Sequence, residues 1–274
     1  MNSDVVERMS TSAPIKPNPV ETAGWLHRQN TQRLRFKPLE PWPAAPDEAY
    51  AYAVQESLLA TRAQAGAALL AGYKIGLTTP RMQTLCRGDR PISGVMPGRG
   101  IHRNGARVAM SEFVHLGIES ELAVRLSHPL PASSAPVTRA DVAAVVLEVA
   151  AAFELIEDRH ADYSTLDWLW MAAENSWHAG IVLGPAVDPR DVSDLAGVLA
   201  IDDVDVDRGS TRDVLGHPYD AVAWLANHLR ARGKRIEAGH WISTGSIATI
   251  RFAEPGRKYR FTIEGLPPVE MQTI

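Results

Sequence analysis

The stretch LGIESELAVRL, residues 116–126, decides the fold, because it predicts one long strand that carries two acids inside an apolar run. Successive side chains of a strand point to opposite faces, so Ile118 and Leu122 share one face. Glu119 and Glu121 then lie side by side on the other face. Two carboxylates held this close repel each other unless they stay in water or a cation lies between them. The strand therefore has either a solvated face or one half of a cation site.

A second stretch, AAFELIEDR at residues 151–159, favours the cation site. It places Glu154 among aromatic and branched aliphatic side chains, a setting too apolar to leave a carboxylate unpaired. Three oxygen ligands without His or Cys suit a hard divalent ion such as Mg²⁺ or Mn²⁺. We therefore expect Glu119, Glu121 and Glu154 to form a three-carboxylate metal site.

The composition of the whole chain excludes several classes of protein. With 274 residues, 45% hydrophobic and 22% charged, the chain has the composition of a globular protein rather than a disordered or fibrous one. The net charge is −4 and no basic stripe occurs, which argues against nucleic acid or an anionic membrane as partner. The single cysteine, Cys86, excludes internal disulfides and thiolate zinc sites and fits a reducing cytoplasm. Since no long apolar span and no nucleotide-binding glycine motif occurs either, we expect a cytoplasmic protein that binds a small molecule.

Three regions follow one another along the chain. Residues 1–19, rich in Ser, Thr and Pro, predict a flexible tail. Residues 20–70 predict a helical cap of two helices, one over 21–36 that ends at a run of prolines and one over 47–66. Residues 71–274 predict a β-rich metal-binding catalytic domain, and the fold class is therefore α+β.

Short apolar runs cut by turn residues predict strands through most of the third region. Asn104 and Gly105 predict a hairpin turn between two of them. Two helices interrupt the strands: one enters at Thr138 and runs over TRADVAAVVLEVA, and the other opens on Pro218 and stops at Gly233.

Eight segments in this order and spacing resemble the fumarylacetoacetate hydrolase superfamily, in its branch of 2-oxopent-4-enoate hydratases and 4-oxalocrotonate decarboxylases. The resemblance covers the chain from about residue 50 to its end. The segments are YAVQ (52–55), GYKIGLTTP (72–80), DRPISG (89–94), IESELAV (118–124), FELIEDR (153–159), AEN (173–175), RGSTRDVLGHP (208–218), and AVAWLANHL (221–229) through AGHWISTGS (238–246).

The resemblance implies a mixed β-roll of the fumarylacetoacetate hydrolase C-terminal domain type, with the helical cap at its N-terminal side. It implies that Glu119, Glu121 and Glu154 hold Mg²⁺ or Mn²⁺. The family's substrates are 2-oxo acids or their enols, which chelate the metal through a carboxylate oxygen and the adjacent oxo or enol oxygen. A cation at that point stabilises the enolate charge that develops when a proton moves along the dienol.

Further site residues follow from the same resemblance. Lys74 matches the family's active-site lysine and is expected to pair with the substrate carboxylate or to assist proton transfer. Thr244, Gly245 and Ser246 match a turn near the substrate, where N–H groups and a hydroxyl could bind a carboxylate, although such a segment is often only a turn. His217 also matches, as a substrate-binding residue or as the cap of the helix that follows it.

One segment departs from the family pattern. In GDRPISG, residues 88–94, the hydratases carry an acid at the position of Ile92, where it serves in proton transfer or water handling. Asp89, three residues earlier, is then the remaining acidic catalytic candidate in this segment. Trp177 and His178 stand where small residues are usual, which predicts a pocket that is narrower or differently hydrogen-bonded.

The function that the resemblance implies is a divalent-metal-dependent hydratase that adds water to a short unsaturated 2-oxo acid such as 2-hydroxypenta-2,4-dienoate. The alternatives are a 4-oxalocrotonate-type decarboxylase, then an acylpyruvate C–C hydrolase with His115 or His178 activating water, then a noncatalytic partner subunit. The three acids and Lys74 argue against the last. The resemblance also implies a homo-oligomer that acts in aromatic compound catabolism. It further implies possible association with a decarboxylase or hydratase partner.

Overall fold

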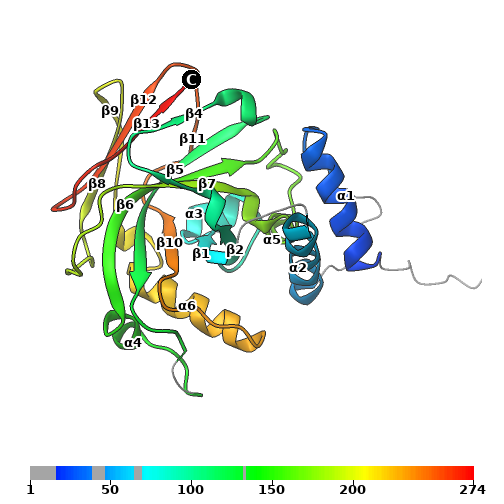
Figure 1. Ribbon diagram of the computed structural model, residues 1–274, viewed down its shortest axis with the longest axis horizontal. Helices are drawn as coiled ribbons and strands as arrows, with labels where there is room; N and C mark the ends of the chain where they lie inside the picture. Colours follow the sequence, from blue (N-terminus) through cyan, green and yellow to red (C-terminus); the bar gives the residue numbers. More distant parts are fainter. Residues whose placement is uncertain (1–16, 39–46, 65–69, 132–133) are drawn as a thin grey trace, which may run out of the picture.

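The computed structural model describes residues 17–38, 47–64, 70–131 and 134–274, so most of the predicted tail lies outside the described residues. Helices α1 (Pro19–Thr31) and α2 (Glu48–Gln64) pack against each other on one side of a β-rich body (Figure 1). The two predicted helices at the N-terminal side are therefore present. The division of residues 20–70 and 71–274 into a cap and a catalytic domain stays a prediction.

The first helix is shorter than expected. Asn18 caps it by accepting a hydrogen bond from the N–H of Val20, and Pro19 opens it. It ends at Thr31 rather than near Phe36, because the N–H of Phe36 donates instead to the carbonyl of Arg159 at 2.8 Å. The segment after α1 is thus tied to the β-rich body.

Two mixed sheets form that body. The larger one has eight strands in the order β2-β1-β10-β5-β6-β7-β3, with β11 also paired to β5, and the smaller one has five in the order β4-β13-β12-β8-β9. Parallel and antiparallel pairs occur in both sheets, which confirms the expected mixed α+β fold. The strands are β1 (Leu70–Gly76), β2 (Ile92–Pro97), β3 (Ile101–Arg103), β4 (Ala106–Val108), β5 (Leu116–Leu126), β6 (Val146–Glu157), β7 (His178–Leu183), β8 (Ala196–Ile201), β9 (Val204–Ser210), β10 (Trp241–Ser246), β11 (Arg251–Phe252), β12 (Lys258–Ile263) and β13 (Val269–Thr273).

The apolar face of β5 lies in the main core. Ile118, Leu122 and Val124 are fully buried and join the core cluster that also contains side chains of the smaller sheet. Helix α6 (Pro218–Ala231) contributes Val222 and Leu225 to the same cluster. One face of β5 is therefore used for packing, and the face with the two acids is left for a site.

The helix predicted over residues 138–150 is wrong beyond its first turn. Thr138 and Asp141 form a capping box, but helix α4 (Arg139–Ala143) has only five residues. The chain then enters β6, where Val146 and Val149 lie opposite residues of β5. Pairing with β5 and burial of the β-branched side chains outweigh the local helical pattern.

The predicted hairpin at Asn104 and Gly105 is also wrong, although the turn itself is present, with Gly105 at a φ of +80°. Strand β3 before the turn pairs with β7 in the larger sheet, whereas β4 after it pairs with β13 in the smaller one. Both turn residues hydrogen-bond to the backbone of Glu270 in β13. The turn thus carries the chain from one sheet to the other.

The second predicted helix of the β-rich region is confirmed as α6, which opens on Pro218 and has Gly233 at a φ of +68° just beyond its end. The structure adds short helices that the sequence did not predict: α3 (Pro80–Leu85), α5 (Trp168–Ala173), and the 3₁₀ turns η1 (Gly98–Gly100), η2 (Met110–Glu112), η3 (Asn175–Trp177) and η4 (Thr211–Asp213). None of the helices within the described part of the chain is long and apolar enough to cross a bilayer.

Candidate active site

The two central strands of the larger sheet bring the three predicted acids together. Glu119 of β5 lies directly opposite Glu154 of β6, and Glu121 follows two residues along on the same face. One carboxylate oxygen of each lies within 4.8 Å of the others. Glu121 and Glu154 are fully buried and Glu119 is partly exposed. The register of this one strand pair is what builds the cluster.

Burial makes three negative charges on this face unfavourable. Burial raises the pKa of Glu119 to about 7, although Lys74 acts against that rise, and burial raises the pKa of Glu121 well above its ordinary value. Burial acts on Glu154 in the same direction, but Lys74 and His178 outweigh it and lower the pKa of Glu154. The face therefore needs a cation to hold all three carboxylates in their charged form.

The free oxygens of this cluster fit a metal ion. Glu121 Oε2 accepts from the hydroxyl of Ser243 at 2.6 Å and from the N–H of Gly245 at 2.8 Å, while its Oε1 is buried without a hydrogen-bond partner. Glu154 Oε1 accepts from His178 Nδ1 at 2.7 Å, and its buried Oε2 has the Lys74 ammonium 3.3 Å away as its partner. Buried polar atoms are rarely left unpaired, and a hard divalent cation would pair with Glu121 Oε1. The residues present thus suit a divalent metal.

Lys74 of β1 lies beside this cluster. Its Nζ is 3.3 Å from Glu154 Oε2 and donates to the hydroxyl of Ser176 at 3.1 Å, and only 2% of the residue is exposed. Burial alone would lower the pKa of Lys74, but the three carboxylates outweigh it and raise the pKa. Gly94, opposite on β2, leaves room for the lysine, because a Cβ there would lie 2.9 Å from Lys74 Cγ. Lys74 is therefore charged, and its contacts with Ser176 and Glu154 fix its position in the site.

A strained backbone turn positions the side chains of Ser176 and His178 beside the acids. Asn175, Ser176 and Trp177 have φ values of 59°, 53° and 54°, a conformation that costs roughly 1–3 kcal/mol for each residue without a glycine. The side chain of Asn175 holds the turn by accepting from the N–H of Val95 at 2.7 Å and donating to its carbonyl at 2.9 Å. The turn places Ser176 on Lys74 and starts β7 so that His178 reaches Glu154. Strain of this kind is common at functional sites.

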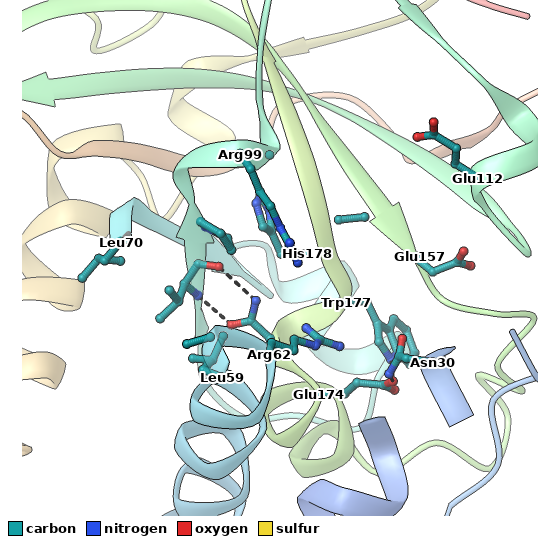
Figure 2. A pocket seen from close by; sticks show the side chains of 16 residues that line it. Asn30, Leu59, Arg62, Leu70, Arg99, Glu112, Glu157, Glu174, Trp177 and His178 are labelled. Atoms are coloured by element: carbon teal, nitrogen blue, oxygen red, sulfur yellow. Dashed lines mark hydrogen bonds between the residues drawn. The ribbon is translucent and has the colours of Figure 1, made fainter. Parts of the chain in front are cut away.

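Two cavities meet at Trp177. The smaller one, about 40 Å³, is next to the acids. The larger one, about 540 Å³, lies on the side of α2 and contains Arg62, Arg99 and His178 (Figure 2). Trp177 lines both and so stands between them. Besides Lys74 and Glu119, the smaller cavity is lined by Ile75, Gly76, Leu77, Thr78, Thr79, Met82, Ile156, Tyr163, Met171, Ser176, Trp177, Ser246 and Ile250.

The predicted substrate turn at residues 244–246 holds the carboxylate of Glu121. Thr244 donates its hydroxyl to the carbonyl of Leu122 at 2.8 Å, and Ser246 donates to the carbonyl of Ala248 at 2.6 Å. Gly245 has a φ of +126°, and a Cβ there would lie 2.2 Å from Thr78 Oγ1. Its N–H is thereby aimed at Glu121. Ser246 lines the small cavity, so its contact with substrate stays a prediction, whereas Thr244 is fully buried.

The structure does not bring His217 or Asp89 to the acids. His217 Nδ1 accepts from the N–H of Tyr219 at 3.0 Å and caps α6, which is the alternative that the sequence left open. Asp89 is exposed, with 67% of its side chain accessible, and binds the guanidinium of Arg90 at 2.8 Å. Ile92 is fully buried in the apolar cluster that also contains Trp177. Ile92 is thus part of an apolar core, and a catalytic role of Asp89 finds no support in this geometry.

The two candidate histidines of the hydrolase alternative lie outside the small cavity. His115 pairs with Asp158 at 2.7 Å, and His178 pairs with Glu154. The sequence did not single out Ser176 or Ser243 as site residues. Ser243 lies inside the matched segment AGHWISTGS, and Ser176 directly follows the matched segment AEN, so their positions in the sequence could have indicated them.

Comparison with known proteins agrees with this geometry. The family model described as "Fumarylacetoacetate (FAA) hydrolase C-terminal" matches residues 81–273. The 2-keto-4-pentenoate hydratase of Burkholderia vietnamiensis is 28% identical over 90% of this chain and 94% of its own, and the 2-oxo-hept-4-ene-1,7-dioate hydratase of Escherichia coli is 32% identical over 72% and 76%. The solved 4-oxalocrotonate decarboxylase of Pseudomonas putida G7, complexed with magnesium and adipate, superposes with a TM-score of 0.87 at 26% identity, over 93% of this chain and 97% of that one. The chain therefore belongs to the fumarylacetoacetate hydrolase family, among relatives named 2-keto-4-pentenoate hydratase and 4-oxalocrotonate decarboxylase.

Proposed function

We propose that the protein is a divalent-metal-dependent hydratase that adds water to a short unsaturated 2-oxo acid with one carboxylate, such as 2-hydroxypenta-2,4-dienoate. The observation that carries the proposal is the group of three carboxylates beside Lys74 at a small cavity, with Glu121 Oε1 buried without a hydrogen-bond partner. Relatives named hydratases, which are lyases, support it.

The metal would be held by Glu119, Glu121 and Glu154, and all-carboxylate ligation favours Mg²⁺ or Mn²⁺. When bound, it supplies a Lewis acid that stabilises negative charge on the enolate oxygen. Magnesium in the similar decarboxylase structure supports a metal of this type.

The protein's own residues then bind and orient the acid. Lys74, charged and fixed by Ser176, offers its ammonium group to the substrate carboxylate. Trp177, Met82 and Ile250 provide an apolar wall for the unsaturated end and limit the water that can enter. A small planar acid with an apolar tail suits these surroundings.

The charge of the small cavity favours a substrate with one carboxylate. Lys74 is the single cationic side chain among the described residues that line it. A second carboxylate buried there would lose its hydration without gaining a partner, which is costly. The arginines Arg62 and Arg99 line the other cavity, beyond Trp177. This distinction matters because the relatives' names include both mono- and dicarboxylic acids.

Decarboxylation of 4-oxalocrotonate is the second candidate. The fold similarity to the decarboxylase from Pseudomonas putida favours it, and so does Ile92 in the place of an acid, since loss of CO₂ needs no activated water. It would use the same three acids and Lys74. A homo-oligomeric state and a cytoplasmic location remain predictions from the resemblance, and light scattering of the purified protein would test the first.

The test is an NMR time course of the purified protein with 2-hydroxypenta-2,4-dienoate, run with Mg²⁺ and again with a chelator, and repeated with 4-oxalocrotonate. We expect 4-hydroxy-2-oxopentanoate to form only with the metal, and 4-oxalocrotonate to remain. Loss of CO₂ from 4-oxalocrotonate without hydration of the dienoate would replace the proposal by the second candidate. No metal-dependent product from either acid would contradict both.

A further inference from the structure

A hydrogen-bonded chain of side chains leads from the small cavity toward the protein surface. Tyr163 lines this cavity together with Lys74 and Glu119, and its hydroxyl donates to Asp158 Oδ2 at 3.1 Å. Asp158 is only 1% exposed. Its other oxygen, Oδ1, accepts from His115 Nδ1 at 2.7 Å and from the N–H of His160 at 2.9 Å. Both oxygens of this buried carboxylate are therefore paired, and its direction is fixed.

His115 forms the outer end of the chain. Its side chain is 26% exposed, and its ring lies stacked against the rings of His160 and Phe252, with centroid distances of 3.9 and 4.0 Å. The stacking fixes the imidazole plane so that Nδ1 faces Asp158. His115 thereby helps to fix the position of the Asp158 carboxylate.

Water addition needs a base in the small cavity, and the described residues that line it leave few choices. Three of them titrate: Lys74, Glu119 and Tyr163. Lys74 pairs with Glu154, and Glu119 belongs to the proposed metal site. Ile92, where the resemblance leads one to expect an acid, is fully buried in an apolar cluster. Tyr163 remains, and it is the one whose proton already points to a buried carboxylate.

We propose, on the basis of the proposed hydratase function, that Tyr163 and Asp158 act as the pair that activates the attacking water, with His115 as a positioning residue. The dienoate first becomes 2-oxopent-3-enoate by gaining a proton from solvent at C5 and losing the proton of its 2-hydroxyl group. An O–H bond of the water then breaks and its proton moves to Tyr163 Oη, while the proton of Tyr163 moves to Asp158 Oδ2. The water oxygen forms its bond to C4 of 2-oxopent-3-enoate, and the electron pair of the alkene moves to the 2-oxo group as an enolate. Return of the proton to C3 gives 4-hydroxy-2-oxopentanoate and restores the charge of Asp158.

The experiment uses the full-length, metal-loaded enzyme and its Tyr163→Phe variant in D₂O. Positioned general bases contribute about 10²- to 10⁴-fold to a rate, so we expect kcat for hydration to fall by about 100-fold or more. KM, Mn²⁺ affinity and deuterium uptake at C5 should change by less than about threefold, because the metal site and Lys74 are untouched. Tyr259→Phe is the matched control: it removes a hydroxyl that accepts one hydrogen bond, from the N–H of Glu254 at 3.1 Å, in the smaller sheet.

Two further variants test the rest of the chain. Asp158→Asn should lower kcat as Tyr163→Phe does, since the amide cannot take the proton. His115→Phe should lower kcat with KM unchanged, and His115→Asn, whose side-chain N–H can replace Nδ1–H, should restore most of the loss. Circular dichroism melting identifies any variant that fails to fold. If the Asp158 or His115 variants do not fold, the kcat of Tyr163→Phe alone tests the proposal.

The outcomes separate this inference from the proposed function. Wild-type protein that does not hydrate the dienoate would overturn the proposed function itself. Wild-type protein that does hydrate it, with Tyr163→Phe hydrating at a rate within about threefold, would overturn the assignment of Tyr163 and leave the hydratase standing.

Discussion

The two faces of strand β5 behave in opposite ways, although they share one backbone. Ile118, Leu122 and Val124 on one face are fully buried among apolar side chains, and their burial stabilises the fold. Burial raises the pKa of Glu119 and Glu121 on the other face. Without a cation beside them, their negative charges therefore destabilise the folded state. One face therefore stabilises the fold, and the other is built for a ligand.

The difference also lies in how the two faces are supported. The apolar face packs as part of one large cluster, in which many buried side chains each contribute to stability. The acidic face is held by single, directed contacts from separate elements: Ser243 and the N–H of Gly245 on Glu121, and Lys74 and His178 near Glu154. We expect mutations on the first face to change stability and mutations on the second to change metal binding.

Glu121→Gln should have the largest effect on function. Replacing a carboxylate ligand removes one negative charge and one metal oxygen, so Mn²⁺ affinity should fall by at least about 100-fold and metal-dependent turnover should be lost. Titration calorimetry and product assays measure both. The matched control is Glu148→Gln, which removes a carboxylate of β6 that pairs with Arg125 at 2.8 Å and leaves the three acids unchanged. Full activity of Glu121→Gln, or of Glu119→Gln, would refute the metal-site assignment.

Leu122→Ala, one residue along on the opposite face, should show the reverse pattern. Truncating a fully buried leucine costs about 2–5 kcal/mol of unfolding free energy, which urea denaturation measures. Mn²⁺ affinity of the folded fraction should stay within about threefold of wild type, because no metal-site contact is removed. A large loss of metal affinity with unchanged stability would show that the two faces are not separate in the way described.

His178→Phe should have a smaller effect on the metal. It removes the Nδ1–H that binds Glu154 Oε1 at 2.7 Å, and losing such a partner of a metal ligand typically lowers affinity about 10- to 100-fold. His178→Asn, which can offer an N–H in the same place, should bind Mn²⁺ almost as wild type does. Equal affinities of the Phe variant and wild type would show that the contact does not orient Glu154.

The pH dependence of the metal-free protein should show the smallest effect. Because burial raises the pKa of Glu119 to about 7, the folded state binds more protons than the unfolded state between about pH 4.5 and 7. This carboxyl therefore stabilises the fold at low pH relative to neutral pH, and that contribution is lost as the pH rises from about 4.5 to about 7. Glu119→Gln should flatten that part of the stability profile, and so should saturating Mg²⁺. If the slope of unfolding free energy against pH is the same in Glu119→Gln as in wild type, the pKa of Glu119 is not raised in the way described.

Most of the acidic site was predictable because a strand's alternation is a local property. The spacing of Glu119 and Glu121 placed them on one face, and the apolar neighbours of Glu154 marked it as unusual. The pairing of Glu119 with Glu154 depends on the register between β5 and β6, which is set by the whole strand pair rather than by either stretch.

The rest depended on contacts between distant segments. The helix expected over residues 138–150 is largely strand because β5 is available to pair with it, and the turn at Asn104 joins two sheets because β13 lies beside it. The left-handed turn at Ser176 depends on Asn175 reaching Val95, 80 residues earlier. Such long-range contacts leave no periodic pattern in the sequence.

The most direct test of the central claim is a crystal structure of the protein with Mn²⁺, located by anomalous scattering. The account predicts one strong peak between β5 and β6, within coordination distance of Glu119, Glu121 and Glu154, and loss of that peak in Glu121→Gln. A fully occupied Mn²⁺ elsewhere, or no ion between these carboxylates at saturating Mn²⁺, would contradict the account.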